Sequence, residues 1–197
     1  MPVPASPQHP RGYGILLLTL LLKALATTAT ASACSHLRPQ DATFSRDSLQ
    51  LLGDMAPSPP QLCPQHSASP CSFNDTILDT SNIWQTDKTT HDILQDLFSI
   101  LSGPSTPPHW IESQRQSLLS HIQRYTQHLE QCLEKNSDTR SRTRRPRNLH
   151  LTISKHFSCL RTFLSDNDYS DCAWDLVLLQ AREWFRRINN LTGNTRT

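Results

Sequence analysis

Glycine is scarce in this sequence, with five residues among 197. Loops that cradle phosphate groups depend on glycine, and the chain contains no G-x-G-x-x-G, P-loop, G-x-S-x-G or H-E-x-x-H motif. Nine histidines could supply acids and bases to a small secreted ribonuclease-like enzyme, but they are scattered without a matched lysine or cysteine context. We therefore expect no enzymatic activity and keep the ribonuclease-like class as the weaker alternative.

The sequence also lacks a hydrophobic run of the roughly 20 residues that span a membrane. The apolar run from Ile15 to Leu22 follows Arg11, and small residues then lead to an A-x-A pattern that ends at Ala33. This arrangement is typical of a secretory signal peptide. We predict that residues 1–33 are cleaved and that residues 34–197 form one secreted, extracellular domain with no membrane insertion.

The predicted mature chain has no excess of positive or negative charge. The whole chain carries 19 basic and 17 acidic residues, and the leader removes two bases, Arg11 and Lys23, and no acid. The balance that remains removes the simplest support for nucleic acid as a partner. Five arginines gather between residues 140 and 147, and we interpret this stretch as a solvated connection rather than a heparin or nucleic-acid patch.

Cysteines and glycosylation sequons are present in the predicted mature chain. An even number of cysteines in a secreted chain predicts disulfide bonds, although their spacing alone does not choose the pairing. No C-x2-C motif occurs, so we expect no zinc site, and we expect no other cofactor. Two sequons, which begin at Asn74 and Asn190, predict N-linked glycans. The six cysteines are Cys34, Cys63, Cys71, Cys132, Cys159 and Cys172.

Apolar residues recur at helical spacing in five stretches, and almost nothing is typical of a strand. A proline- and serine-rich connection from Ala56 to about Cys71 separates the first two stretches. Long amphipathic helices with one long early connection predict an all-α, up-up-down-down cytokine bundle of five helices with a long first crossover loop. The five predicted helices cover about 41–55, 87–102, 110–134, 146–164 and 172–191.

The last predicted helix has more apolar residues than one buried stripe requires. On a helical wheel one arc provides an ample core face. Leu178 lies at the edge of that arc, whereas Leu176 and Leu179 fall among charged and polar residues. Leucines ringed by charge resemble the apolar centre of an interface, so we predict a partner surface here. The arc contains Ala173, Trp174, Val177, Ala181, Trp184, Phe185 and Ile188.

Several short motifs carry a resemblance to a known family. "YSDCAWD" opens the last predicted helix, "KHFSCL" lies in the fourth, "HLEQC" ends the third with "HW" before it, and the chain ends in "NNLTGNTRT". Together with the cysteine spacing, these motifs resemble type I interferons over essentially the whole mature chain. The resemblance is closest to the avian interferon-alpha group.

The resemblance implies two disulfide bonds, Cys34 with Cys132 and Cys63 with Cys172. Cys71 and Cys159 are extra to the usual two-bridge pattern. A third bridge between them and a pair of free thiols both stay open at this point.

The resemblance also implies a function and two receptor-binding surfaces. The expected protein is an antiviral cytokine that bridges the two chains of the type I interferon receptor and triggers kinase signalling to antiviral genes. In the family the tighter receptor chain contacts the long first loop and one face of the last helix, and the weaker chain contacts the second, third and fourth helices. Another secreted four-helix cytokine is the main alternative. The last-helix face carried over is Leu178, Leu179, Arg182, Glu183 and Arg186, and Gln123 and Lys155 are weaker matches for the second chain.

Overall fold

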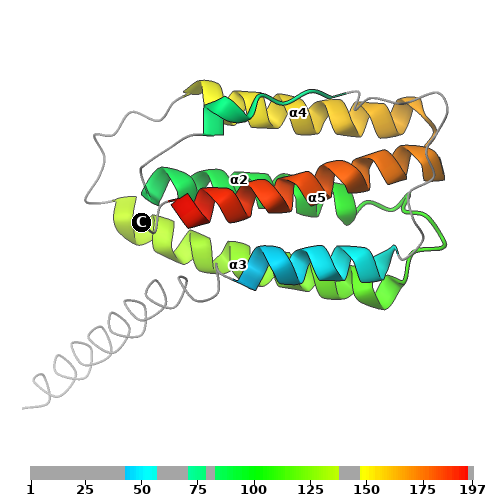
Figure 1. The fold of residues 1–197 in the computed structure, drawn as a ribbon, viewed down its shortest axis with the longest axis horizontal. Helices are drawn as coiled ribbons and strands as arrows, with labels where there is room; N and C mark the ends of the chain where they lie inside the picture. Colours follow the sequence, from blue (N-terminus) through cyan, green and yellow to red (C-terminus); the bar gives the residue numbers. More distant parts are fainter. Residues whose placement is uncertain (1–42, 57–70, 79–82, 138–146, 195–197) are drawn as a thin grey trace, which may run out of the picture.

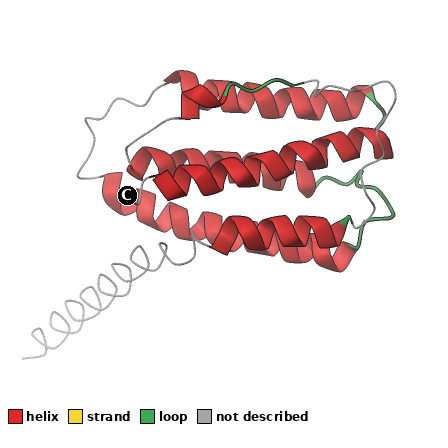
Figure 2. Cartoon of the chain, viewed as in Figure 1, coloured by secondary structure: helices red, strands yellow, loops and turns green. Residues whose placement is uncertain are grey.

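The computed structural model describes residues 43–56, 71–78, 83–137 and 147–194. Within these ranges the chain forms helices and no strand (Figure 1, Figure 2), as predicted. Besides a first helix over residues 43–55, the elements are a 3-10 helix η1 (Asp75–Leu78), α2 (Ile83–Leu101), α3 (Glu112–Ser137), α4 (Arg147–Asp166) and α5 (Asp171–Asn194). Three predicted features lie outside the described residues: the signal peptide, most of the long first connection and the arginine-rich loop.

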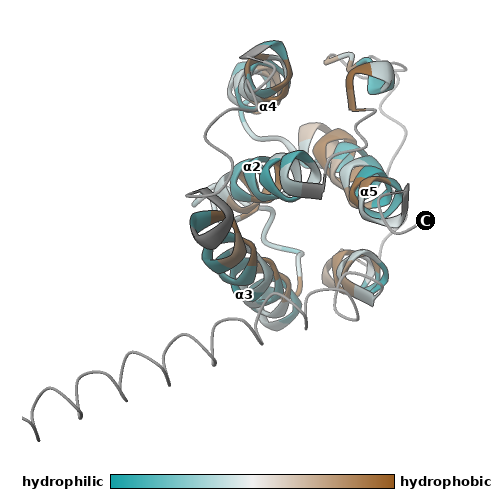
Figure 3. Ribbon diagram, turned by 90° about the vertical axis from the view of Figure 1, so that its left-hand side faces the viewer, coloured by the Kyte–Doolittle hydropathy of each residue, from teal (hydrophilic) through white to brown (hydrophobic). Residues whose placement is uncertain are grey.

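The helices pack side by side with the direction expected of the cytokine class. The first helix and α2 run one way along the bundle, and α3 and α5 run the opposite way (Figure 1). α4 lies between α3 and α5 in the sequence and runs parallel to α2 (Figure 1). The view along the bundle places α2 between α3 and α4 (Figure 3). α2 packs against α3, α4 and α5, so it forms the centre of the helical arrangement.

α5 provides the largest part of the core. All seven residues of its predicted apolar arc are buried, with Trp184 and Phe185 fully enclosed at 0% exposure. Burial of each large side chain stabilises the fold by about 1.5 to 3 kcal/mol. The indole N–H of Trp174 is satisfied because it donates to the carbonyl of Ser105, 2.8 Å away, in the connection between α2 and α3. α5 is therefore tied to the bundle by packing along its length and by a hydrogen bond near its N-terminus.

The first helix is held to α3 and α5 through Phe44. The ring of Phe44 stacks on Tyr125 with centroids 4.0 Å apart and on His121 at 4.9 Å, and it meets the edge of Phe185 at 6.2 Å. Stacked and edge-on aromatic pairs contribute about 0.5 to 1.5 kcal/mol beyond their buried area. His121 on α3 is half-buried, and its burial lowers its pKa.

Four helices extend beyond a predicted bound: α3 ends at Ser137, α4 ends at Asp166, and α2 and α5 are longer at ends that contain buried residues. α2 begins at Ile83 rather than near Asp87, and the added turn buries Thr86. α5 continues to Asn194, past the predicted end at Leu191, which is itself buried. In α2 and α5 tertiary burial stabilises turns whose own sequence gives a weak helical signal.

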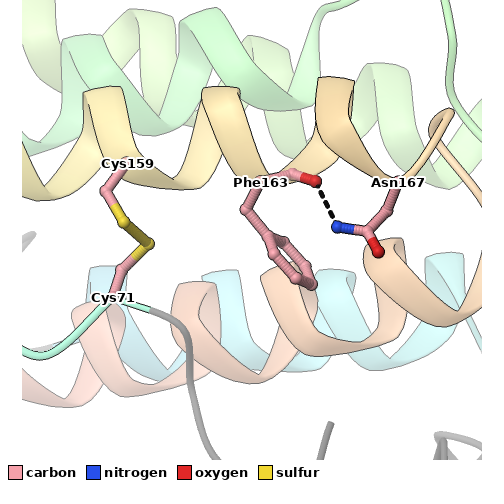
Figure 4. Close-up of a disulfide and its surroundings, with 4 residues drawn as sticks. All are labelled: Cys71, Cys159, Phe163 and Asn167. Atoms are coloured by element: carbon pink, nitrogen blue, oxygen red, sulfur yellow. Dashed lines mark hydrogen bonds between the residues drawn. A yellow bond between two sulfur atoms is a disulfide. The ribbon is translucent and has the colours of Figure 1, made fainter. Parts of the chain in front are cut away.

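α4 and α5 are joined by a tight turn. Asp168 and Tyr169 adopt left-handed backbone conformations, with φ of 49° and 52°. The side-chain amide of Asn167 donates to the carbonyl of Phe163 at 2.8 Å (Figure 4), and the N–H of Tyr169 donates to the carbonyl of Leu164 at 2.9 Å. These bonds satisfy carbonyl groups at the end of α4, which otherwise lack partners.

A disulfide joins the end of the first connection to α4. Cys71 pairs with Cys159 on α4, with their Cα atoms 5.9 Å apart (Figure 4), and Cys71 is 4% exposed. This bond decides between the third bridge and the free thiols that the sequence left open. Cys132 and Cys172 are also disulfide-bonded, and their pairing with Cys34 and Cys63 stays a prediction because the two latter residues lie outside the described residues.

Candidate binding surface

The exposed face of α5 centres on Leu179. Its side chain remains 36% exposed, although it lies within a helix whose neighbouring leucine is completely enclosed. Glu183 and Arg186 follow one and two turns later, with 47% and 59% of their side chains exposed, and they form an ion pair with each other. Arg182 is half-buried beside them. The arrangement is a single apolar side chain within a charged rim, whereas the wheel predicted two such leucines, Leu176 and Leu179.

The predictions for the two other leucines are wrong. Leu178 was expected on the partner face, but it is 1% exposed and belongs to the core. Leu176 was placed outside the core arc, but it is partly buried and packs against the core. The cause is that α5 contacts both α2 and α4. Two neighbouring helices cover a wider arc of the α5 surface than one helix could.

An ion pair limits the charge that this face presents. Glu183 and Arg186 neutralise each other locally, and pairs this exposed typically contribute less than about 1 kcal/mol to stability. A weak pair of this kind can separate at little cost when either group meets an oppositely charged partner. The charged side chains of the rim can therefore change partners when another protein binds, and they contribute little to the stability of the fold.

The residues proposed for a second face do not form one cluster. Gln123 is exposed on α3 and lines an open cleft between α2 and α3 together with Gln95, Phe98 and Glu130. Lys155 is exposed on α4. Since α2 lies between α3 and α4 (Figure 3), the two proposed residues lie in separate parts of the surface.

A polar network that joins α2 to α3 and α4 was not predicted from the sequence. Asp92 on α2 is 8% exposed and accepts from Lys88 Nζ at 2.6 Å, while its second oxygen lies 3.0 Å from Nδ1 of His150 on α4. His91 Nε2 lies 2.9 Å from Glu130 Oε1 on α3. The spacing of Lys88 and Asp92, four residues apart on one helix, was the available signal.

The network shifts the pKa of its buried histidine. The hydrogen bond with Asp92 is the largest cause that raises the pKa of His91, Glu130 adds to the rise, and burial opposes it. A charged imidazole can donate to both carboxylates, so protonation strengthens the links within α2 and between α2 and α3. The network therefore links α2 to both α3 and α4.

A short segment, residues 71–78, crosses from α4 to α5 and borders the exposed face; we call it the strap. Phe73 packs edge-on against Trp184 of α5 at 4.6 Å and against His156 of α4 at 5.5 Å. Arg187 of α5 stacks over Trp184 at 4.8 Å and over Phe73 at 5.4 Å, and its Nε donates to Asp75 at 2.7 Å. Sequence reasoning missed Arg187, because two of its partners, Phe73 and Asp75, lie more than a hundred residues away in the chain.

Both sequons begin at exposed asparagines. Asn74 lies in the strap, where its side-chain oxygen accepts hydrogen bonds from the N–H and the hydroxyl of Thr76 at 3.1 and 2.8 Å. Asn190 lies on α5, but the hydroxyl of Thr192 is turned inward and donates to the carbonyl of Ile188 at 2.9 Å. Either asparagine side chain has room for a glycan in the folded protein.

The described residues contain neither a candidate metal site nor a helix that could span a membrane. No group of three or more histidine, cysteine or acidic side chains is close enough there to hold a metal ion. None of the helices in these ranges is sufficiently long and apolar to cross a membrane. The exposed face of α5 is therefore the strongest candidate binding surface in the described part of the chain.

Comparison with known proteins gives consistent matches over nearly the whole chain. The family model described as "Interferon alpha/beta domain" matches residues 37–195. The chain is 81% identical to "Interferon type A1/A2" of Gallus gallus and 75% identical to "Interferon" of Meleagris gallopavo, and each alignment spans 197 residues and 100% of both chains. The solved structure of "Zebrafish interferon 1" superposes with a TM-score of 0.62 at 19% identity, covering 78% of this chain and 94% of that one.

Proposed function

The chain belongs to the interferon alpha/beta family, and from this premise we propose that it is secreted and bridges the two chains of the type I interferon receptor. Bridging brings the receptor chains together and starts kinase signalling to antiviral genes. Members of the family are cytokines rather than enzymes, which sets aside the ribonuclease-like alternative and the unrelated four-helix cytokines. No cofactor is required, because the whole action is binding.

The exposed Leu179 within its charged rim is the observation that supports the first receptor surface. A leucine that is partly exposed in the free protein gains free energy when a partner completes its burial. Interface energy concentrates in such apolar centres, while surrounding polar groups exclude water and set orientation. We assign Leu179, Arg182, Glu183 and Arg186 to the tighter receptor chain, and we withdraw Leu178 because it is enclosed in the core.

The second receptor surface is proposed for the cleft between α2 and α3. Gln123 lines this cleft with other side chains that both donate and accept hydrogen bonds, and Phe98 gives it an apolar wall. Such a surface is suited to a weaker, more polar contact than the one on α5. Lys155 on α4 stays a separate prediction outside this cleft.

The two surfaces lie on different sides of the bundle, which bridging requires. α5 and α3 lie beside different sides of α2 (Figure 3), and we expect a receptor chain on one surface to leave the other open. We expect that loss of either surface abolishes signalling, while binding to the chain that contacts the intact surface is retained.

An antiviral assay tests the proposal directly. Purified protein is applied to matched cell lines that have both receptor chains, lack one chain or lack the other, and the cells are then infected. We expect protection and activation of receptor-associated kinases only when both chains are present. Protection that persists without either receptor chain would refute the proposed mechanism, whatever the fold of the protein.

A further inference from the structure

Asn190 lies on the same exposed stripe of α5 as the candidate receptor surface. Successive helical residues are about 100° apart, so Asn190 is only about 20° from Leu179 around the helix axis and about 40° from Arg186. It follows Arg186 by one turn, or about 6 Å along the axis, and it follows Leu179 by about 16 Å. Both Arg186 and Asn190 are exposed.

The folded structure limits when Asn190 could be modified. Within α5 the hydroxyl of Thr192 donates to the carbonyls of Ile188 and Asn189, at 2.9 and 3.3 Å, and Thr192 is 6% exposed. This hydroxyl is part of the sequon that the modifying enzyme recognises. The modification must therefore precede the closure of the last turn of α5, whereas the exposed asparagine side chain can carry the product afterwards.

We propose that Asn190 is a regulatory glycosylation site whose glycan weakens binding to the tighter receptor chain. This inference rests on the proposed function of the α5 face. In the reaction, Asn190 Nδ2 forms a bond to the anomeric carbon of an oligosaccharide carried on a lipid pyrophosphate. The bond from that carbon to the lipid pyrophosphate breaks, and the lipid pyrophosphate and the displaced amide proton leave.

The expected effect follows from crowding at the edge of the binding surface. A glycan rooted one turn beyond Arg186 samples the space above the charged rim, and a bound receptor chain would exclude much of that space. Association then costs the conformational freedom of the glycan and any hydration that the receptor displaces. We expect the glycan to lower affinity about threefold to tenfold without changing the core, because Asn190 itself makes no core contact.

Asn74 provides an internal comparison. Its sequon lies in the strap, next to Asp75, which pairs with Arg187 on the flank of α5 rather than on the Leu179 stripe. Arg187 is about 80° from Leu179 around the helix axis, against about 20° for Asn190. A glycan on Asn74 is therefore expected to have the smaller effect on the same receptor chain.

The test compares glycoforms of the full secreted protein made in animal cells. Asn190→Gln removes the sequon, Asn189→Gln is the matched control in the same turn, and Asn74→Gln removes the other glycan. Glycopeptide mass spectrometry measures occupancy, and binding to the purified tighter receptor chain measures affinity. The amidase that releases N-glycans converts the released asparagine to aspartate, so the treated Asn74→Gln protein is compared with Asn190→Asp, which carries the same charge without a glycan.

The expected result is an occupied Asn190, with affinity that rises about threefold to tenfold in Asn190→Gln and after glycan release but not in Asn189→Gln. An unmodified Asn190, or equal affinity of occupied and unoccupied forms, overturns the inference while leaving the receptor assignment intact. Failure of every glycoform, including the enzymatically deglycosylated protein, to bind the receptor chain would instead overturn the proposed function.

Discussion

Leu178 and Leu179 are neighbours in the chain, yet the structure predicts opposite consequences when each is replaced. Leu178 is 1% exposed, so Leu178→Ala removes a fully buried side chain and leaves a cavity, at a cost of about 2 to 5 kcal/mol in the free energy of unfolding. Leu179 keeps 36% of its surface in water, and Leu179→Ala should cost less than about 1.5 kcal/mol because solvent can fill the space.

The order reverses for receptor binding. Completing the burial of the exposed third of Leu179 is worth about 0.5 to 1 kcal/mol by area alone. Leu179→Asp loses this gain and adds the cost of removing a carboxylate from water, so we expect at least about a tenfold loss of affinity for the tighter receptor chain, or about 1.4 kcal/mol. Leu178→Ala should leave affinity nearly unchanged when equal concentrations of folded protein are compared.

Chemical unfolding followed by circular dichroism and direct binding to the purified receptor chain provide the two measurements. Leu151→Asp is the matched control, since Leu151 is an exposed leucine of α4, 53% exposed, outside the α5 face. It should tolerate the charge and bind the tighter chain normally. Wild-type affinity in Leu179→Asp would refute the assignment of Leu179 to the receptor surface. Lost affinity in a fully stable Leu178→Ala would show that Leu178, rather than Leu179, contacts the receptor chain.

Three further predictions concern the strap and its neighbours. Burial, and secondarily the charge of Arg187, lower the pKa of His156 to about 4, so the unfolded chain takes up a proton between about pH 6.5 and 4 that the folded chain does not. Stability should fall by about 2 to 3 kcal/mol over that window, and His156→Phe should flatten this part of a pH series of denaturant titrations. Replacing Cys71 and Cys159 by serine should lower the free energy of unfolding by about 2 to 5 kcal/mol, and a change of less than 1 kcal/mol would argue against this bridge. Arg187→Ala should destabilise more than Asp75→Asn, because the stacking on two rings is partly desolvated whereas Asp75 is largely exposed; equal losses in denaturation would contradict this ranking.

Histidines in this bundle respond to acid in opposite directions. The raised pKa of His91 makes its network more stabilising below its ordinary pKa, and this contribution is lost as pH rises through the folded value. The lowered pKa values of His156 and His121 have the reverse effect, because each neutral ring must be charged at the expense of burial. The net response to mild acid therefore depends on the balance between the link that His91 makes from α2 to α3 and the aromatic packing around His156 and His121.

The disulfide between Cys71 and Cys159 holds the strap against α4. Cys71 fixes its start to α4, Phe73 fills the groove between α4 and α5, and the pair of Asp75 and Arg187 fixes its end on α5. The strap thus joins α4 to α5 on the flank of the candidate receptor surface. A surface that binds a partner benefits from such support, because a rigid surface loses less conformational entropy on association.

Helical periodicity determined the class of this protein from its sequence. The apolar repeats predicted five helices, and the seven residues of the α5 arc are all buried in the structure. The motifs around Cys172 and at the end of α3 predicted the family correctly. These properties could be read from sequence because each depends on residues that are close together in the chain.

Tertiary structure decided what periodicity left ambiguous. Leu176, Leu178 and Leu179 look alike in the sequence, but α2 and α4 enclose the first two to different degrees and leave the third partly exposed. Arg187 and the cluster around Asp92 acquire their roles from partners on other helices, so no local pattern identifies them. The sequence by itself thus determined the helices, the family and the core stripe of α5. The structure decided which side chains reach solvent, because burial depends on every element that packs around a residue.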